Sequence, residues 1–276
     1  MSWSTGLPHG AGKPDVKPMA APDKSLLVFG LHACATTLTH APVDVLELWV
    51  RAEASHPDLE VLSARAASLG LRVQRANLAT LDRLAGGGVH QGIVLRRRPP
   101  TPLGFDALRA GLRDAGAPPL LLAIDQPQDP HNLGACLRVA DGAGVRAVLL
   151  PRDRSVGLTP VVAKVASGAA DTVPLVHVPN LVRALETLKE EGLWVAGATH
   201  DASLGLYDAD LTVPLVLVMG AEGTGLRRLT REVCDLLLHI PMRGAVSSLN
   251  LSTAAAVCLF EAGRQRAGLS RGAGSP

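Results

Sequence analysis

Three short segments of the chain combine glycine with polar or charged side chains, and they are the first candidates for chemistry. They comprise residues 125–138, 220–225 and 241–250. Glycine lets the backbone approach a ligand closely, and the free N–H groups at the start of a helix can bind polar or anionic ligand atoms. The three segments could therefore form a ligand site that offers the arginine Arg138 and the carboxylate of Glu222 to the bound molecule.

Each segment also has a simpler structural explanation. Asn132 could cap a helix and Arg138 could be an ordinary surface arginine, and spacing alone favours these explanations for that pair. The loop around Glu222 could be a plain turn with an exposed acid. Ser247 or Ser248 could cap the helix that follows the third segment. Helix capping and ligand binding are compatible, so residue types alone leave both open.

The elements around these segments favour the ligand site. From residue 120 onward, apolar stretches of strand length alternate with helical ones, which predicts a parallel sheet with both faces covered. Ligands of such sheets lie at the carboxyl ends of the strands, where all three segments fall. The predicted strands are 120–124, 147–150, 173–178, 194–198, 213–219 and 236–240, and a long helix at 249–265 closes the domain.

A smaller α/β domain is predicted before this one, over residues 25–98. Its expected helices are 31–39, 57–69 and 78–84, and its expected strands are 45–50, 71–75 and 92–95. The segment 99–118 is rich in Pro and Gly, contains a short helical piece at 105–114, and is interpreted as a linker to the second domain at 119–267. The polar ends, 1–24 and 268–276, are expected to be a disordered extension and tail.

Composition excludes several classes of protein. No apolar run reaches the ~18 residues of a spanning helix, and the N-terminus lacks the apolar core of a signal peptide. We therefore expect a soluble cytoplasmic protein with no membrane partner. The four cysteines form no CxxC pair, so buried thiols are expected rather than a disulfide framework or a metal site.

Charge and aromatic content limit how the chain could contact a nucleic acid. The formal net charge is only +2, and aromatic residues make up 3% of the chain, too few for a base-stacking sheet. Any RNA contact must rely on charge and shape. The run Arg96, Arg97 and Arg98 is the candidate for phosphate binding, and a solvated surface is the alternative.

Two nucleotide-binding patterns are absent or misplaced. Residues 142–147 match a loose GxGxxA pattern, but they follow a helix and precede a strand, which is the reverse of the order in dinucleotide-binding domains. A helix stop is the better interpretation. No GxxxxGK[ST] loop occurs in the sequence. Nucleotide hydrolysis and ordinary NAD chemistry therefore lose support.

The three segments resemble, in order, the three motifs of the SpoU (TrmH-like) family of RNA ribose 2'-O-methyltransferases, part of the SPOUT superfamily. Motif one is matched by Asn132, Gly134 and Arg138, motif two by residues 220–223, and motif three by residues 240–242 followed by 247–252. Residues 29–33 and 89–93 also resemble the ends of the family's ribosomal-protein-L30e-like RNA-binding domain. The resemblance covers about residues 26–266.

This resemblance implies a fold and a reaction. The fold would be α/β, with an L30e-like RNA-binding domain followed by a SPOUT domain, which has a mostly parallel sheet and a trefoil knot. S-adenosylmethionine would be the cofactor, no metal would be needed, and the catalytic residue would be Arg138. The resemblance implies that Asn132, Glu222, Ser248 and Asn250 position Arg138 and the ribose, and that the cofactor contacts Thr199, Gly220, Ile240, Met242 and Leu249.

Within the family, residues 129–138 are most similar to the branch that methylates a guanosine of 23S ribosomal RNA. A tRNA or another rRNA nucleotide is the alternative target, and a non-catalytic RNA-binding ribosome-assembly factor is the alternative class. The apolar surface of the closing helix, together with the pairing usual in the family, predicts a homodimer through the second domain.

Overall fold

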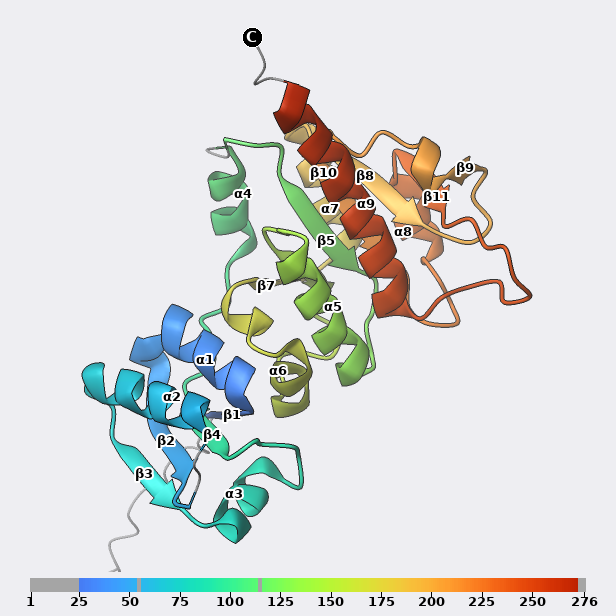
Figure 1. The fold of residues 1–276 in the computed structure, drawn as a ribbon. Helices are drawn as coiled ribbons and strands as arrows, with labels where there is room; N and C mark the ends of the chain where they lie inside the picture. Colours follow the sequence, from blue (N-terminus) through green and yellow to red (C-terminus); the bar gives the residue numbers. More distant parts are fainter. Residues whose placement is uncertain (1–24, 54–55, 114–115, 273–276) are drawn as a thin grey trace, which may run out of the picture.

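The computed structural model describes residues 25–53, 56–113 and 116–272 (Figure 1). The described residues form a four-stranded sheet of order β1-β4-β2-β3 and a seven-stranded sheet of order β7-β6-β5-β10-β8-β11-β9. The predicted disordered extension, residues 1–24, and the last four residues of the predicted tail lie outside the described residues.

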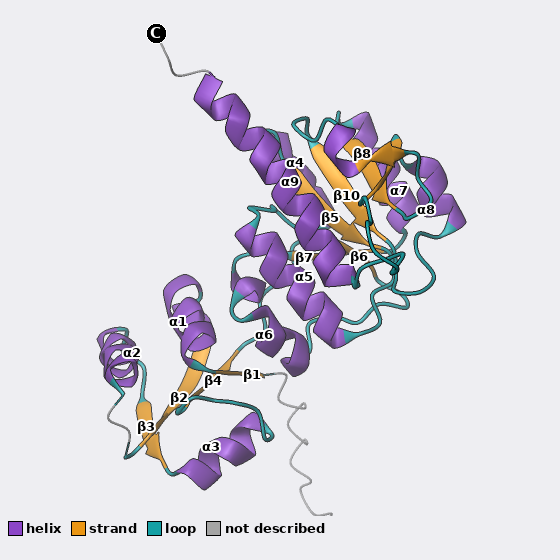
Figure 2. Ribbon diagram, turned by 45° about the vertical axis from the view of Figure 1, so that its right-hand side comes forward, coloured by secondary structure: helices purple, strands orange, loops and turns teal. Residues whose placement is uncertain are grey.

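The small sheet consists of β1 (Leu26–Phe29), β2 (Val45–Arg51), β3 (Val73–Ala76) and β4 (Ile93–Arg97). Strand β4 pairs antiparallel with β1 and β2, and β2 pairs parallel with β3. Helices α1 (Leu31–His40) and α2 (Pro57–Ser68) pack against one face of this sheet, and α3 (Leu78–Ala85) packs against the other (Figure 2). The alternation predicted for this region is confirmed, but β1 was not predicted.

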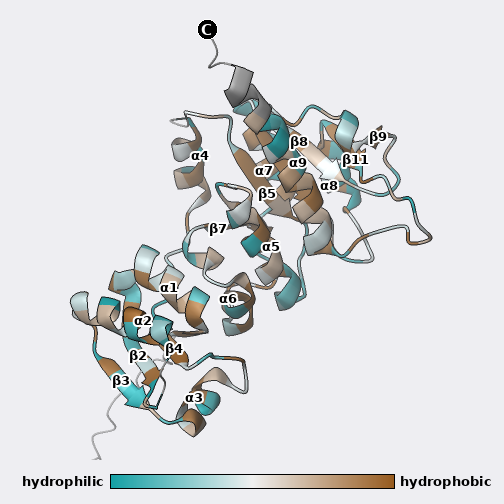
Figure 3. Cartoon of the chain, in the orientation of Figure 1, coloured by the Kyte–Doolittle hydropathy of each residue, from teal (hydrophilic) through white to brown (hydrophobic). Residues whose placement is uncertain are grey.

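The large sheet is parallel in every strand pair of the described residues, as the sequence predicts. Its central strands are hydrophobic along their length (Figure 3), and all residues of β5 and β10 are buried. In β5, alternate residues enter opposite cores, so both faces of the sheet are covered. The strands are β5 (Leu120–Ile124), β6 (Val148–Pro151), β7 (Leu175–Val178), β8 (Trp194–Ala198), β9 (Leu204–Gly205), β10 (Leu215–Met219) and β11 (Leu236–His239).

Helices α5 (Pro130–Gly142), α6 (Pro160–Ala166) and α9 (Leu251–Gly272) cover one face of this sheet. Helices α4 (Phe105–Arg113), α7 (Leu181–Glu190) and α8 (Arg228–Val233) cover the other. Helix α9 continues to Gly272, so residues 268–272 of the predicted tail are helical. Helix α5 ends at Gly142, and Gly144 has a φ of +71°, which confirms residues 142–147 as a helix stop.

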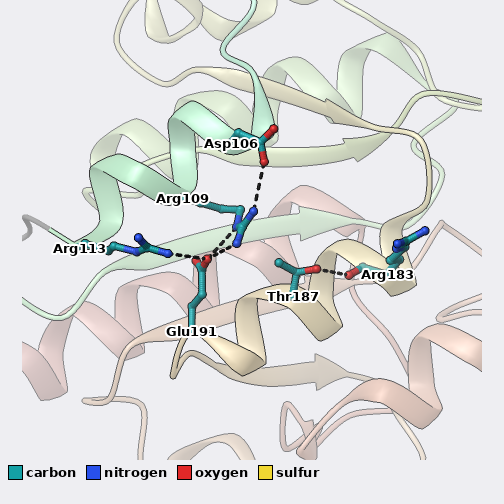
Figure 4. Close-up of polar contacts among 6 residues, drawn as sticks. All are labelled: Asp106, Arg109, Arg113, Arg183, Thr187 and Glu191. Atoms are coloured by element: carbon teal, nitrogen blue, oxygen red, sulfur yellow. Dashed lines mark hydrogen bonds and ion pairs between the residues drawn. The ribbon is translucent and has the colours of Figure 1, made fainter.

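Helix α4 lies within the segment interpreted as a linker, yet it packs on the large sheet. Leu108 and Leu112 are buried in the core that α4 shares with α7. Figure 4 shows Arg109 and Arg113 meeting Glu191 just beyond the end of α7. Arg109 Nε donates to Glu191 Oε1 at 2.7 Å. Residues 105–113 are therefore part of the second α/β unit. The Pro and Gly that flank the helix gave the segment its linker-like composition.

Candidate active site

A chain of side-chain hydrogen bonds joins the three segments that the sequence singled out. Asn132 on α5 donates from Nδ2 to Glu222 Oε2 at 2.8 Å, and Asn250 donates from Nδ2 to Asn132 Oδ1 at 2.9 Å. Asn132 is 7% exposed, whereas Glu222 and Asn250 are exposed. The buried amide thus holds two exposed polar groups in place from the protein side. Three of the five predicted catalytic residues are brought together here.

Asn132 does not cap its helix, contrary to the simpler explanation considered from the sequence. Asp129 is the capping residue, and its Oδ1 accepts a hydrogen bond from the His131 N–H at 2.9 Å. The amide of Asn132 is therefore available to Glu222 and Asn250. The error arose because Asp and Asn are both good capping residues, and spacing alone did not tell which one precedes the first helical turn.

The start of α9 is held by Asn250 rather than by the serines before it. Asn250 Oδ1 accepts hydrogen bonds from the Ser252 N–H at 2.9 Å and from Ser252 Oγ at 2.7 Å. Ser247 and Ser248 are exposed and do not cap the helix, so that explanation was wrong. Ser248 makes no side-chain hydrogen bond with the described residues. Asn250 thus both starts α9 and orients Asn132.

The loop that carries Glu222 is closed on itself and anchored to β5. The Gly225 N–H donates to Ala221 O at 2.9 Å, and a Cβ on Gly220 would lie 2.1 Å from the backbone carbon of Gly225, so only glycine fits there. Arg227 bonds from Nε to the fully buried Asp125 side chain at 2.7 Å. Sequence reasoning missed this ion pair between an exposed arginine and a buried carboxylate, although Asp125 opens the first segment.

The residues predicted to hold the cofactor follow three adjacent strands. Thr199, Gly220 and Ile240 lie directly beyond the carboxyl ends of β8, β10 and β11, which neighbour one another in the sheet. These three residues, and Met242 and Leu249, are partly exposed. The structure therefore gathers glycine backbone and apolar side chains at the sheet edge where ligands of parallel sheets bind.

A second acid and arginine pair borders this edge. Asp201 accepts hydrogen bonds from Thr199 Oγ1 at 2.6 Å and from Arg231 Nη1 at 2.8 and 2.9 Å. The bond from Thr199, followed by the contact with Arg231, lowers the pKa of Asp201 from its usual 3.8 to about 2. This pair was also missed, because no sequence pattern links residues 30 positions apart.

Arg138 is exposed on α5 and stands apart from the hydrogen-bonded chain. An α-helix has about 3.6 residues per turn, so Arg138 projects from a different face of α5 than Asn132 does. Its guanidinium forms no hydrogen bond or ion pair with any residue that the structure describes. An exposed guanidinium without an internal counter-charge is free to bind an anionic ligand.

The arginine run at the end of β4 differs from the expectation. Arg97 is 2% exposed and forms an ion pair with the buried Asp171, so it cannot contact RNA phosphate. Arg96 is partly buried and pairs with Glu47. Arg98 is exposed, with its Nη1 3.3 Å from Val43 O. Of the three predicted RNA-binding residues, only Arg98 is clearly available, because side chains alternate across a strand and Arg97 faces inward.

The remaining findings concern metal ligands, membrane-spanning helices and cysteines in the described part of the chain. Among residues 25–53, 56–113 and 116–272, no three or more His, Cys, Asp or Glu side chains are grouped to hold a metal ion. Likewise, no helix in the described part of the chain is long and apolar enough to cross a membrane. Cys34, Cys136 and Cys258 are buried free thiols, as predicted, whereas the fourth free thiol, Cys234, is partly exposed. Burial raises the pKa of Cys136 and Cys258 to about 12.

Comparison with known proteins agrees with this geometry. Residues 119–260 match the model of the SpoU rRNA Methylase family, and residues 27–103 match the model for RNA 2'-O ribose methyltransferase substrate binding. The chain is 51% identical over 239 residues to the 23S rRNA (guanosine-2'-O-)-methyltransferase RlmB of Pseudomonas putida, covering 87% of this chain and 96% of that protein.

Solved structures show the same fold. A crystal structure of an RNA 2'-O ribose methyltransferase aligns with a TM-score of 0.71 and 26% identity, over 88% of this chain and 90% of that one. The SpoU methyltransferase AviRb from Streptomyces viridochromogenes, in complex with AdoMet, aligns with a TM-score of 0.69 and 24% identity, over 88% and 91%. The chain belongs to the SpoU rRNA methylase family, with a small α/β unit before a mostly parallel SPOUT-type domain.

Proposed function

We propose that this protein transfers a methyl group from S-adenosylmethionine to the ribose 2'-hydroxyl of a guanosine in 23S ribosomal RNA. The observation that carries the proposal is the hydrogen-bonded chain Glu222–Asn132–Asn250, which joins all three family motifs at one sheet edge. The identity of 51% to a relative named for this reaction, over nearly the whole of that relative, supports the choice of substrate.

The residues at the sheet edge fit the cofactor. Gly220 cannot carry a side chain because the backbone of Gly225 and Leu226 fills that space, so the loop closes tightly at the strand end. Ile240, Met242 and Leu249 are partly exposed apolar side chains that suit an adenine ring. We propose that these residues and Thr199 hold S-adenosylmethionine, which supplies an electrophilic methyl group when bound.

The chain's own residues would orient the ribose and stabilise charge. Glu222 Oε1 accepts no hydrogen bond from the described residues, so it can accept one from the 2'-hydroxyl, while Oε2 is held by Asn132. Arginine side chains stay protonated in proteins. We therefore assign Arg138 to binding RNA phosphate and stabilising negative charge on the 2'-oxygen rather than to removing the proton. Ser248, exposed beside Asn250, would position the ribose.

We also propose that the chain is knotted and dimeric through the second unit. Strand β11 lies on the side of β8 that faces away from β10 and β5. After β11 the chain returns across the carboxyl ends of the inner strands, and α9 packs against α5. Phe260 on α9 is 55% exposed beside Gly142 on α5, which supports a second copy covering this face. A solution mass near 28.7 kDa in light scattering at micromolar concentration would contradict the dimer.

The decisive experiment is methyl transfer to unmodified transcripts. The purified protein should bind S-adenosylmethionine in calorimetry with and without EDTA, and it should methylate a 23S rRNA transcript at one guanosine ribose. A tRNA pool and a 16S rRNA transcript are the controls for the alternative substrates. Cofactor binding without transfer to any RNA would favour the non-catalytic assembly factor, although the intact Glu222–Asn132–Asn250 chain argues against that class.

A further inference from the structure

The segment made of α6 and the short helix η2 (Ala169–Asp171) lies between helix α5 and the small α/β unit (Figure 1). Helix α6 contacts both α5 and β1, and η2 contacts both α5 and α1. The segment is therefore in contact with the helix that carries Asn132 and Arg138, and also with the unit that matches the substrate-binding model.

The contact between α6 and α5 is close and leaves little room for movement. A Cβ on Gly134 would lie 2.6 Å from Val165 Cβ and 2.9 Å from Val162 O. Only glycine allows the two helices to approach this far, which gives a physical reason for the glycine of motif one. At the far end of α5, the Thr172 hydroxyl donates to Asp141. The segment is thus held against α5 at both ends.

On its other side, the segment meets the small unit through buried polar groups. Asp171 has a side chain 4% exposed; it forms an ion pair with Arg97 and accepts a hydrogen bond from Thr37 Oγ1 at 2.6 Å. Arg97 and Thr37 come from β4 and α1 of the small unit, and they are 2% and 0% exposed. Each oxygen of the Asp171 carboxylate therefore bonds to a different element of the small unit.

Two further features belong to this contact. Lys164 of α6 lies 4.9 Å from the centre of the Phe29 ring on β1, a cation–π contact between the units. The cavity beside the ion pair is only about 10 Å³, with room for about one water molecule. Because a buried charge that loses its partner is strongly disfavoured, separating the two units at this contact would be costly.

We propose that Asp171 is a positioning residue for methyl transfer: through Arg97 and Thr37 it fixes the orientation of the RNA-binding unit relative to α5. This inference rests on the proposed function. RNA captured by the small unit would then reach the sheet edge with its target ribose already aligned. Alignment of this kind affects the rate of methyl transfer within the bound complex and not the affinity for RNA or for S-adenosylmethionine.

The test compares Asp171→Asn with the wild-type full-length chain. The variant should keep its Kd for S-adenosylmethionine and for a 23S rRNA transcript within about twofold, while the single-turnover rate at saturating RNA falls at least about tenfold. Small-angle X-ray scattering should show a larger radius of gyration for the variant. Glu186→Gln is the matched control, because it removes one exposed carboxylate on α7 and should change none of these values.

A second variant protects the test against misfolding. Thr37→Val keeps the shape of the side chain but removes the hydroxyl that bonds to Asp171, so it should lower the single-turnover rate in the same direction with a smaller effect. Unchanged cofactor affinity shows that the large sheet is folded. If both variants transfer methyl groups at the wild-type rate, the inference is wrong. If the wild type itself transfers none, the proposed function is wrong. In that case the scattering comparison alone decides whether Asp171 fixes the orientation of the small unit.

Discussion

Two arginine-bearing regions have opposite environments. At the end of β4, three successive arginines suggest a surface for RNA, yet Arg97 is buried against Asp171 and Arg96 is paired with Glu47. On α5, the isolated Arg138 has no ion pair within the described residues and is exposed. The difference teaches that the environment of a basic side chain, and not the number of its neighbours in sequence, determines whether it is available to an anionic ligand.

The largest effect is expected at Arg138. Arg138→Ala should lower the single-turnover methylation rate by about 10²-fold or more, because it removes charge stabilisation that is needed only in the transition state. Affinity for S-adenosylmethionine should change little. Arg138→Lys should restore little activity, since a lysine cannot reproduce the planar guanidinium. Wild-type single-turnover rates in the Ala variant would show that Arg138 is not catalytic.

The next largest effect is on stability at Arg97. Arg97→Met should lower the free energy of unfolding by about 3–5 kcal/mol, because it leaves the Asp171 carboxylate buried without its partner. Urea denaturation measures the change. The matched variant Arg98→Gln, at the exposed neighbour, should change stability by less than about 0.5 kcal/mol. Equal losses in both variants would mean that burial does not distinguish these two arginines.

Arg98 should show a smaller effect on RNA binding. It is the clearly exposed member of the run, so Arg98→Gln should weaken affinity for the rRNA transcript and reduce the slope of log K against log salt by about one. Binding titrations at several salt concentrations give the slope. An unchanged slope would show that the exposed arginine of the run does not contact RNA phosphate, so the run of three arginines would have only a structural role.

The smallest expected effect is on the ionisation of Asp201, the partner of an arginine that is neither buried like Arg97 nor, within the described residues, unpaired like Arg138. Arg231 pairs with the exposed Asp201, whose pKa is lowered from 3.8 to about 2. Because the pKa of Asp201 is lower in the folded than in the unfolded state, its ionised form stabilises the protein at any pH above the unfolded-state pKa. This contribution is lost as the pH falls through the folded-state pKa of about 2. Carbon-13 NMR titration of the Asp201 carboxyl should therefore give a midpoint at a pH of about 2. A midpoint at 3.8 would show that neither Thr199 nor Arg231 bonds to it in solution.

The sequence predicted features that depend on local pattern. Strands 120–124 and 194–198 were placed to the residue, because strands in the interior of a parallel sheet read as unbroken apolar runs. The two-residue strand β9 was not predicted, because it is too short to show a period.

The sequence did not predict features that depend on distant partners. The partner of Arg97 is Asp171 and the partner of Asn132 is Glu222, and no spacing rule connects either pair. The candidate site was found through its motifs, whereas the orientation of its side chains required the fold.

The hydrogen bond between Asn250 and Asn132 joins residues 118 positions apart, which has a consequence for the order of synthesis. A growing chain completes α5 and the first strands of the large sheet well before Asn250 and α9 leave the ribosome. Until then Asn132 lacks its donor, and the apolar face of the sheet that α9 covers is open to solvent. The candidate site is thus among the last parts of the molecule to form, and a chain interrupted before residue 250 would have neither a complete site nor a closed core.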